Sequence, residues 1–342
     1  MKPLSSKKRN IILTAFIIIF AIVLPFLILY SIGFRFSNKS LVKTGGLYVH
    51  KPIVDATISL DNKPLDERLT SFLQRYYFVQ SLRPEDYTVK AEFPDYYTWE
   101  KTIPVLSQRI TEVAPFLIAQ KPQTTLVPQF LNSSDNATED VSSESTLRIT
   151  ASGDKNNIPN PLYKKVKNLF EEAKTQWEDE EKDYNELIIA YNKLIVQTPG
   201  APDPLETEGL NENSSTIIEQ PKLHIKVRQK IEVWRDENSL NIISQLEKDS
   251  TSLPFFCNTV EVCRLPQTIT DVRANSRFDF FPGRNDVIIV QKNDGIYAVE
   301  LDGRGTRNIF PLYLGKDISF VVEDSNQIYI RDAKDYYLLE LD

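Results

Sequence analysis

The apolar residues are distributed unevenly, and the longest apolar run lies near the start of the chain. Ile11 to Ile32 contains no charged residue and few polar ones. At about 1.5 Å of rise per residue, a helix of this length reaches about 33 Å, which is enough to cross a hydrocarbon core of about 30 Å. The pattern therefore predicts a transmembrane helix over residues 11–33, in which Pro25 loosens the helix locally.

Two alternatives compete with a membrane anchor. A buried core helix is disfavoured because the run is apolar on every face. A cleaved signal peptide normally has an apolar region of about 7–15 residues, which is shorter than this one, although Ser31-Ile32-Gly33 offers a small-x-small pattern. We expect residues 1–10 to form a cytoplasmic tail because nearly all of the folded mass follows the helix. The positive-inside rule gives only weak support for this orientation, because basic residues stand on both sides of the apolar run. Lys2, Lys7, Lys8 and Arg9 precede it, and Arg35, Lys39 and Lys43 follow it.

Residues 45–119 show short alternating runs separated by turn residues, which predict a small antiparallel β-sandwich. Ala56 to Leu60 and Tyr87 to Phe93 alternate with a period of two, and Asp61-Asn62-Lys63-Pro64 is a turn cluster. This region resembles a PEGA domain in Gly46-Leu47-Tyr48-Val49, in Asp55-Ala56-Thr57-Ile58-Ser59-Leu60-Asp61, in Leu82-Arg83-Pro84-Glu85-Asp86-Tyr87 and in Asp95-Tyr96-Tyr97-Thr98-Trp99. The resemblance implies an envelope setting and no particular reaction.

Residues 120–160 are rich in Ser, Thr, Asn and Asp and are expected to form a flexible linker. Asn160-Pro161 then fits a helix N-cap followed by proline at the first helical position. Apolar residues recur at steps of four and three through residues 161–197, with Glu180 in the one polar slot. This predicts a long amphipathic helix that packs on its own β domain, or a helical hairpin broken near Glu178–Asp183. A coiled coil that joins two copies of the chain through residues 161–197 is the alternative.

A second linker is expected over residues 198–222, and residues 223–342 read as an antiparallel β meander. Val287 to Val290 should pair with Ile296 to Glu300 across a turn that contains Asp294-Gly295. The region resembles blades of a β-propeller, as in membrane-anchored PEGA proteins of small-genome bacteria of the Patescibacteria type. About 120 residues supply only two or three four-stranded blades, so the sequence predicts an incomplete propeller or an open sheet sandwich. The strand-like stretch Thr146–Ala151 is a candidate for additional edge strands.

Composition narrows the classes of function. The formal net charge of −7 argues against a nucleic-acid-binding protein. Two cysteines and two histidines are too few for a dedicated zinc or haem site, so no metal and no cofactor is expected. Cys257 and Cys263 are instead candidates for a structural disulfide that closes a short loop. Tyr96, Tyr97 and Trp99 are candidate ligand-contact aromatics, with core packing as the simpler explanation.

The sequence thus predicts a mainly β, single-pass protein of the cell membrane, with an extracellular C-terminal bulk and without enzymatic activity. Its partners would be the lipid bilayer, through residues 11–33, and an envelope protein, a surface layer or a cell-wall glycan. The alternatives are a hydrolase of wall polymers with two carboxylates at a propeller mouth, and a sensor or assembly factor that dimerises through the long helix.

Overall fold

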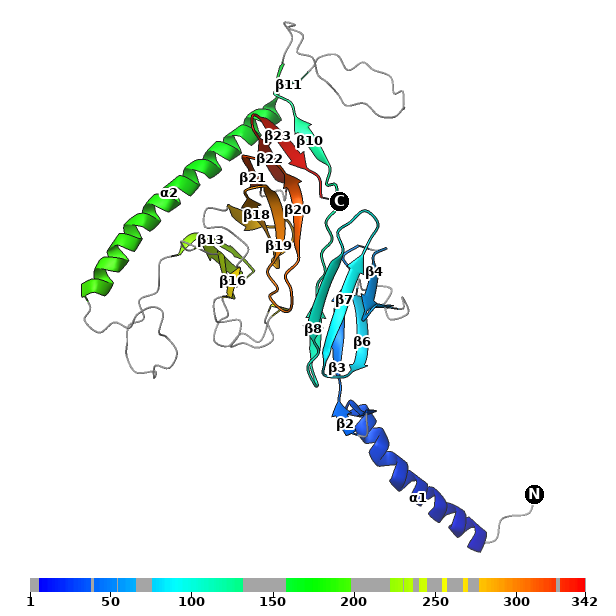
Figure 1. Ribbon diagram of the computed structural model, residues 1–342. Helices are drawn as coiled ribbons and strands as arrows, with labels where there is room; N and C mark the ends of the chain where they lie inside the picture. Colours follow the sequence, from blue (N-terminus) through cyan, green and yellow to red (C-terminus); the bar gives the residue numbers. More distant parts are fainter. Residues whose placement is uncertain are drawn as a thin grey trace, which may run out of the picture. The chain divides into compact units, whose positions relative to one another are not determined.

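The computed structural model describes residues 6–37, 40–53, 55–65, 76–131, 158–197, 222–229, 231–235, 240–244, 254–256, 267–269, 277–323 and 327–341. The chain forms two compact units. Unit 1 contains residues 1–119, 254–258 and 302–308, and unit 2 contains residues 120–253, 259–301 and 309–342. The predicted mainly β class is confirmed: antiparallel sheets accompany two helices in the described residues (Figure 1).

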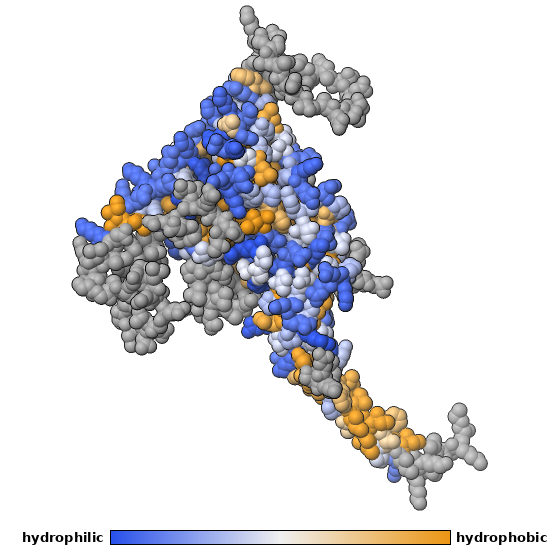
Figure 2. Space-filling model, in the orientation of Figure 1, coloured by the Kyte–Doolittle hydropathy of each residue, from blue (hydrophilic) through white to orange (hydrophobic). Residues whose placement is uncertain are grey.

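Unit 1 begins with the predicted apolar helix, α1 (Ser6–Ser31), which has Pro25 inside it. Its span Ile12–Ser31 is long and apolar enough to cross a membrane, and none of that span is buried in the structure. Apolar side chains line the visible side of this span in Figure 2. Within the described residues this span is not buried, which is the opposite of what a core helix requires.

A short hairpin follows α1, at a place where no element was predicted. Strand β1 (Phe34–Ser37) pairs with β2 (Ser40–Lys43) immediately before the first sheet. Gly33 has a φ of +91°, a backbone conformation that favours glycine, and it turns the chain from the helix into the hairpin.

Two sheets build the rest of unit 1. The first has the order β6 (Tyr76–Leu82), β3 (Gly45–His50), β9 (Ile110–Val113), and the second has the order β5 (Lys63–Pro64), β4 (Thr57–Leu60), β7 (Asp86–Glu92), β8 (Trp99–Pro104). Burial alternates along β7 and β8, so each strand sends one face into the core. The largest fully buried side chains include Leu47, Ile58, Trp99 and Ile103.

The predicted turn at Asp61–Pro64 is confirmed. Leu60 pairs with Lys63, and the two residues between them, Asp61 and Asn62, have φ values of 48° and 63°. Positive φ at both central residues is the signature of a type I′ hairpin, which Asp and Asn tolerate better than most residues. The prediction of a wholly antiparallel sandwich is wrong in one detail, because β9 pairs with β3 in parallel. β8 and β9 follow each other in the chain but belong to different sheets, so β9 enters the first sheet beside β3 rather than by a hairpin.

Unit 2 contains three four-stranded antiparallel sheets. The first consists of β13 (Leu223–Arg228), β14 (Ile231–Arg235), β15 (Leu240–Ser244) and β16 (Gln267–Ile269). The second consists of β17 (Phe278–Phe280), β18 (Val287–Lys292), β19 (Gly295–Glu300) and β20 (Ile309–Leu314). The third has the order β10 (Thr124–Val127), β23 (Asp335–Leu339), β22 (Ile328–Asp332), β21 (Ile318–Val322). The predicted pairing of β18 with β19 is confirmed, with Val287 opposite Glu300.

The predicted linker over residues 120–160 is wrong at both of its ends. β10 joins the edge of the third sheet, where Thr124 pairs with Leu339 and Val127 with Tyr336. β11 (Phe130–Leu131) pairs with β12 (Ile158–Pro159). The polar composition of this region led to the linker prediction. Thr124 and Thr125 nevertheless form a strand, because they pair with Leu339 and Leu338, which are far away in the sequence. Thr146–Ala151, the stretch expected to add edge strands, lies outside the described residues.

The second helix, α2 (Pro161–Gln197), is continuous. Its N-cap is Asn160, whose Oδ1 accepts a hydrogen bond from the Leu162 amide at 2.9 Å, while its Nδ2 donates to the Pro128 carbonyl at 2.8 Å. Val166 and Phe170 pack in a core cluster with Val127, Val321, Tyr329 and Tyr336. The helix thus lies on its own β unit, in contact with β13, β21 and β23.

Three edge strands, one from each sheet, lie near one another. β13 contacts β17, β17 contacts β21, and α2 contacts β13 and β21 (Figure 1). The helix therefore packs against edge strands of the first and the third sheet. Apolar packing of α2 against these strands stabilises the arrangement. In the described residues, the three sheets do not close into a barrel.

Candidate functional site

The outward face of the sheet β6–β3–β9 carries a group of aromatic side chains. Tyr48 lies opposite Phe78, and His50 lies opposite Tyr76. The rings of Tyr48 and Tyr76 stack, with centroids 4.6 Å apart and an interplanar angle of 26°. The His50 ring meets Tyr76 edge-on, with centroids 4.5 Å apart. All four side chains are half-buried, so they do not belong to the core formed by the other face of the sheet.

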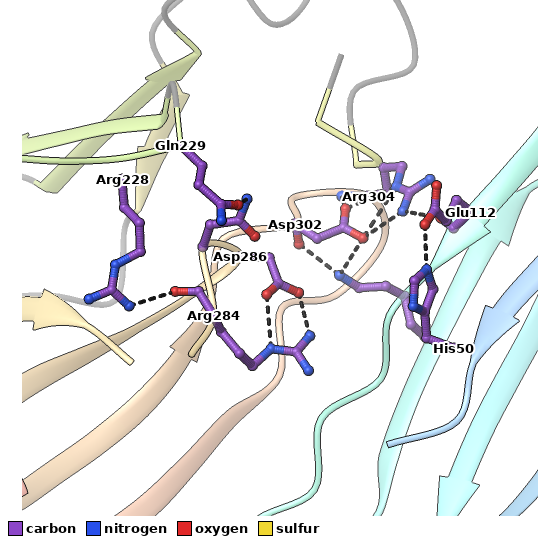
Figure 3. Close-up of polar contacts among 10 residues, drawn as sticks. His50, Glu112, Arg228, Gln229, Arg284, Asp286, Asp302 and Arg304 are labelled. Atoms are coloured by element: carbon purple, nitrogen blue, oxygen red, sulfur yellow. Dashed lines mark hydrogen bonds and ion pairs between the residues drawn. The ribbon is translucent and has the colours of Figure 1, made fainter. Parts of the chain in front are cut away.

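A histidine–glutamate pair lies on the same face. Glu112 stands opposite Tyr48 in the parallel pairing, and its Oε1 contacts His50 Nε2 (Figure 3). The two side chains are 32% and 40% exposed, so a ligand in solution can reach both. Partial desolvation, followed by the neighbouring Tyr76 and Glu112, raises the pKa of Tyr48. The Tyr48 hydroxyl therefore stays protonated at neutral pH and can donate a hydrogen bond.

Ile110 extends this face along β9 and is 64% exposed. We call Tyr48, His50, Tyr76, Phe78, Ile110 and Glu112 together the aromatic face. Exposed apolar and aromatic residues that gather on one side of a sheet are typical of an interaction surface.

Beside the aromatic face, unit 1 holds a buried ionic cluster. Lys101 lies on the inward face of β8, and its Nζ donates to the Asp302 carbonyl at 2.7 Å and lies 3.5 Å from the Asp302 carboxylate. Arg304 Nη2 contacts the same carboxylate at 2.9 Å and donates to the Glu112 carbonyl at 2.8 Å (Figure 3). The side chains of Lys101, Asp302 and Arg304 are 0%, 1% and 7% exposed.

This ionic cluster attaches residues 302–308 to the sheet. Gly305, at a φ of +62°, lies so close to β8 that an added Cβ would be 2.5 Å from the Thr102 carbonyl oxygen. The Asn308 amide bonds the backbone of Glu100, which lies on the same edge strand. The segment thus covers a sheet edge that would otherwise expose unpaired backbone groups. Complete burial leaves no room for a substrate, so the cluster is structural.

Residues 254–256 approach the aromatic face. The ring centroids of Phe255 and His50 are 6.4 Å apart, and the Arg304 guanidinium lies 5.9 Å from the Phe255 ring. Phe255 therefore borders the aromatic face on the side of the ionic cluster.

Unit 2 has its own polar network. Arg284 Nε bonds the Asp286 carboxylate at 2.9 Å, and Arg228 Nη1 donates to the carbonyls of Phe281 and Arg284 at 2.7 and 3.0 Å (Figure 3). Asn285 bonds Gln229 at 2.7 Å. These contacts join the turn after β17 to the end of β13, and they brace two sheets against each other rather than presenting reactive groups.

The acidic stretch of α2 meets basic side chains on the first sheet of unit 2. His224 is buried, stacks on Trp177 and bonds Glu180 through Nδ1. Arg235 bonds Glu181 at 3.0 Å. Of the two alternatives predicted for residues 161–197, the single long helix is confirmed and the helical hairpin broken near Glu178–Asp183 is wrong. Glu180 and Glu181 contact partners on the sheet, and the helix continues through them. Burial lowers the pKa of His224, and the bond to Glu180 only partly opposes that shift.

The aromatic residues singled out from the sequence do not form a platform. Trp99 is fully buried and belongs to the core, while Tyr96 and Tyr97 are half-buried. Tyr96 packs edge-on against Phe93, with ring centroids 5.2 Å apart. Cys257 and Cys263 lie outside the described residues. The aromatic face was missed because its members come from three separate strands, and only their register places them side by side.

The accessible groups of the aromatic face are of the kinds that contact ligands. Within the described residues, no group of three or more His, Cys, Asp or Glu side chains is placed to hold a metal ion. The accessible groups are aromatic rings, two tyrosine hydroxyls and one histidine–carboxylate pair, which stack on and hydrogen-bond to a ligand. Comparison of the chain with models of known protein families and with curated proteins gives no match.

Proposed function

We propose that the protein is a membrane-anchored component of the cell envelope that binds or scaffolds other envelope molecules and is not an enzyme. Residues 11–33 would span the bilayer, with residues 1–10 in the cytoplasm and both β units outside. The observation that carries the proposal is α1, an apolar helix that no part of the structure buries. In water such a surface would be exposed at a large free-energy cost, and in a bilayer that cost disappears.

The aromatic face supplies the binding part of the proposal. It gathers accessible rings and hydrogen-bonding groups on the outside of a sheet, where they contribute little to the core. Its ligand would be another envelope protein, a surface layer or a cell-wall glycan. The resemblances to a PEGA domain and to propeller blades are part of the same proposal. Three four-stranded antiparallel sheets whose edge strands β13, β17 and β21 are neighbours support the second resemblance. The hydrolase alternative is less well supported, since three of the buried carboxylates are engaged by cations: Asp286 and Asp302 by arginine, and Glu232 by Lys222.

The anchor is tested by expressing the full chain and washing the membranes at high salt and alkaline pH. We expect the protein to stay in the membrane pellet, and protease added outside intact cells should digest the β units. Recovery in the soluble fraction would refute the anchor. Digestion only after lysis would place the β units on the other side.

The binding surface is tested by crosslinking and affinity purification of the full chain from intact cells. A Tyr48→Ser/Tyr76→Ser variant should lose the recovered partner, whereas the matched Tyr96→Ser/Tyr97→Ser variant should keep it. Partners that survive the first change and disappear with the second would show that the sequence-based candidates form the binding surface. Circular dichroism of both variants controls for folding.

A second candidate function, assembly through α2, is favoured by the far end of that helix. The core contacts of α2 include Tyr184, which is 7% exposed, but Leu187 and Ile189 are 56% and 69% exposed. Residues i and i+2 of a helix do not share a face, so a second copy of the chain would cover the side of α2 that carries Ile189. Sedimentation of the full chain in detergent should then show a dimer that Ile189→Glu converts into a monomer, and a wild-type monomer at high concentration would eliminate this function.

A further inference from the structure

The hairpin β1–β2 joins the membrane helix to the first sheet and has an unusual composition. Phe34 pairs with Lys43, Arg35 with Val42, and Phe36 with Leu41. Between Phe34 and Lys43 the sequence contains three basic residues and no acidic one, in a chain whose formal net charge is −7. One of the three, Lys39, lies outside the described residues, so the argument rests on Arg35 and Lys43.

Hydrogen bonds hold this hairpin at the end of α1. Arg35 Nη1 donates to the Tyr30 carbonyl at 2.9 Å, and Nη2 donates to Ser81 Oγ at 2.9 Å. The Gly33 carbonyl accepts bonds from the Thr44 amide at 3.0 Å and from Thr44 Oγ1 at 2.8 Å. A cation that bonds a carbonyl in the last turn of the helix also complements the helix dipole. The hairpin is therefore fixed beside the point where the apolar span ends.

The side chains of the hairpin suit the boundary between lipid and water. The Arg35 guanidinium lies 3.6 Å from the centre of the Tyr30 ring, and Lys43 Nζ lies 5.3 Å from the centre of the Phe34 ring. Because adjacent residues of a strand point to opposite sides, these two cations occupy opposite faces of the hairpin. Leu41, on the same face as Lys43, is 40% exposed. Aromatic rings and snorkelling cations at the end of a transmembrane helix are found at the level of the lipid headgroups.

From these observations we infer that the hairpin β1–β2 is a headgroup-level contact that selects anionic phospholipids through Arg35 and Lys43. The inference rests on the proposed anchoring and names the lipid class that the anchor prefers. Two cations and no acidic residue complement the lipid phosphate and an anionic headgroup. The inference also explains why basic residues stand on both sides of the anchor. Arg35 and Lys43, which follow the helix, would contact lipid headgroups and would not determine which end of the helix is cytoplasmic.

The test is a lipid titration of the full chain in detergent micelles, followed by native mass spectrometry. Phosphatidylglycerol and phosphatidylcholine with identical acyl chains are added separately, and the apparent Kd of each is measured. We expect phosphatidylglycerol to bind more tightly, and Arg35→Gln and Lys43→Gln each to weaken it roughly fivefold, since one cation near an anionic surface is worth about 1 kcal/mol. The double variant should lose roughly 25-fold, and the preference of the wild type should shrink at high salt.

Two controls separate a headgroup contact from a purely structural role. Lys63→Gln removes an exposed cation from β5 of the same unit and should leave the selectivity unchanged. Arg35→Lys keeps the charge but loses the planar fork that reaches Tyr30 and Ser81, so it should retain most of the lipid preference even if the hairpin is less stable. Equal binding of both lipids by the wild type would overturn the inference and leave the anchor intact. Failure of the chain to enter the membrane pellet would instead refute the anchor itself.

Discussion

Unit 1 and unit 2 each hold buried basic side chains beside carboxylates, but they bury the carboxylates to different extents. In unit 1 this is the ionic cluster, and in unit 2 it is the contact of Glu180 and Glu181 on α2 with His224 and Arg235. Lys101 and Asp302 are almost completely removed from water. The Lys101 ammonium donates to the Asp302 carbonyl and lies 3.5 Å from the Asp302 carboxylate, which also accepts a hydrogen bond from Arg304. In unit 2 only one side of the contact is buried. His224 and Arg235 are 0% and 7% exposed, whereas their partners Glu180 and Glu181 are 36% and 41% exposed.

The difference in burial determines how much stability each contact loses when one charged partner is removed. A fully buried charge needs its partner, because the low-dielectric interior offers no water to replace it. A half-exposed glutamate keeps part of its hydration and therefore loses less when its partner is removed. The cluster of unit 1 should behave as a rigid attachment, and the contact of α2 should respond gradually to mutation and to pH.

The largest effect is expected from Asp302→Ala. The change leaves Lys101 and Arg304 buried without the carboxylate that both contact, which typically costs about 3–5 kcal/mol. The free energy of unfolding is measured by denaturant titration of the full chain in micelles. The exposed Asp335→Ala on β23 is the matched control and should change the free energy of unfolding by less than about 0.5 kcal/mol. Equal losses in the two variants would contradict a special role for the ionic cluster.

Gly305→Ala should be the next most damaging change in unit 1. Gly305 has a φ of +62°, and an added Cβ would lie 2.5 Å from the Thr102 carbonyl oxygen. We expect a loss of about 2–3 kcal/mol, from the strained backbone and the forced separation of residues 302–308 from β8.

Gly283→Ala isolates the backbone part of that loss. Gly283 has a φ of +70° with nothing within 4 Å of an added Cβ, so its cost should be only about 1 kcal/mol. If the two alanine variants lose the same stability, the close approach of residues 302–308 to β8 contributes nothing.

A smaller loss is expected from Asn160→Ala at the start of α2. The variant loses the cap of the Leu162 amide and the bond to the Pro128 carbonyl, and N-cap removal typically costs about 1 kcal/mol. Asn160→Asp keeps the cap and loses only the second bond, so its stability should lie between those of the wild type and the alanine variant. An aspartate variant as unstable as the alanine variant would assign the effect to Pro128 instead.

Features that depend on neighbouring residues could be predicted from the sequence. Asn160-Pro161 marked the start of α2, and Asp294-Gly295 marked the turn between β18 and β19, because capping and turn formation are local. The apolar run of α1 was equally clear, since its signal is carried by every residue in it. These elements required no knowledge of what lies elsewhere in the fold.

Features that depend on distant partners could not be predicted. The role of Asp302 depends on Lys101, which is 201 residues away in the chain. Lys101 itself looks like an ordinary surface residue until the alternation of β8 places it on the inward face. The aromatic face was hidden for the same reason, because Tyr48 and Tyr76 become neighbours only through the register of β3 and β6.

The smallest expected effect is the pH dependence of the α2 contact. Burial lowers the pKa of His224 below its ordinary value of 6.5, so the folded protein holds this imidazole neutral where the unfolded chain would protonate it. The unfolded state then binds more protons, and stability falls as the pH drops below about 6.5. The bond to Glu180 favours the protonated form and limits the loss.

His224 is one of only two histidines in the chain, so the titration can be followed directly by NMR of the imidazole protons. We expect the His224 resonance to titrate below pH 6.5 and Glu180→Gln to lower that midpoint further, because the variant removes an interaction that favours the charged imidazole. Control spectra of His50→Gln assign the two resonances. A His224 midpoint above 6.5 would show that the half-exposed glutamates outweigh burial. His224 would then be a buried cation that depends on its carboxylate partner, as Lys101 does in unit 1, and the contrast between the two ionic contacts would disappear.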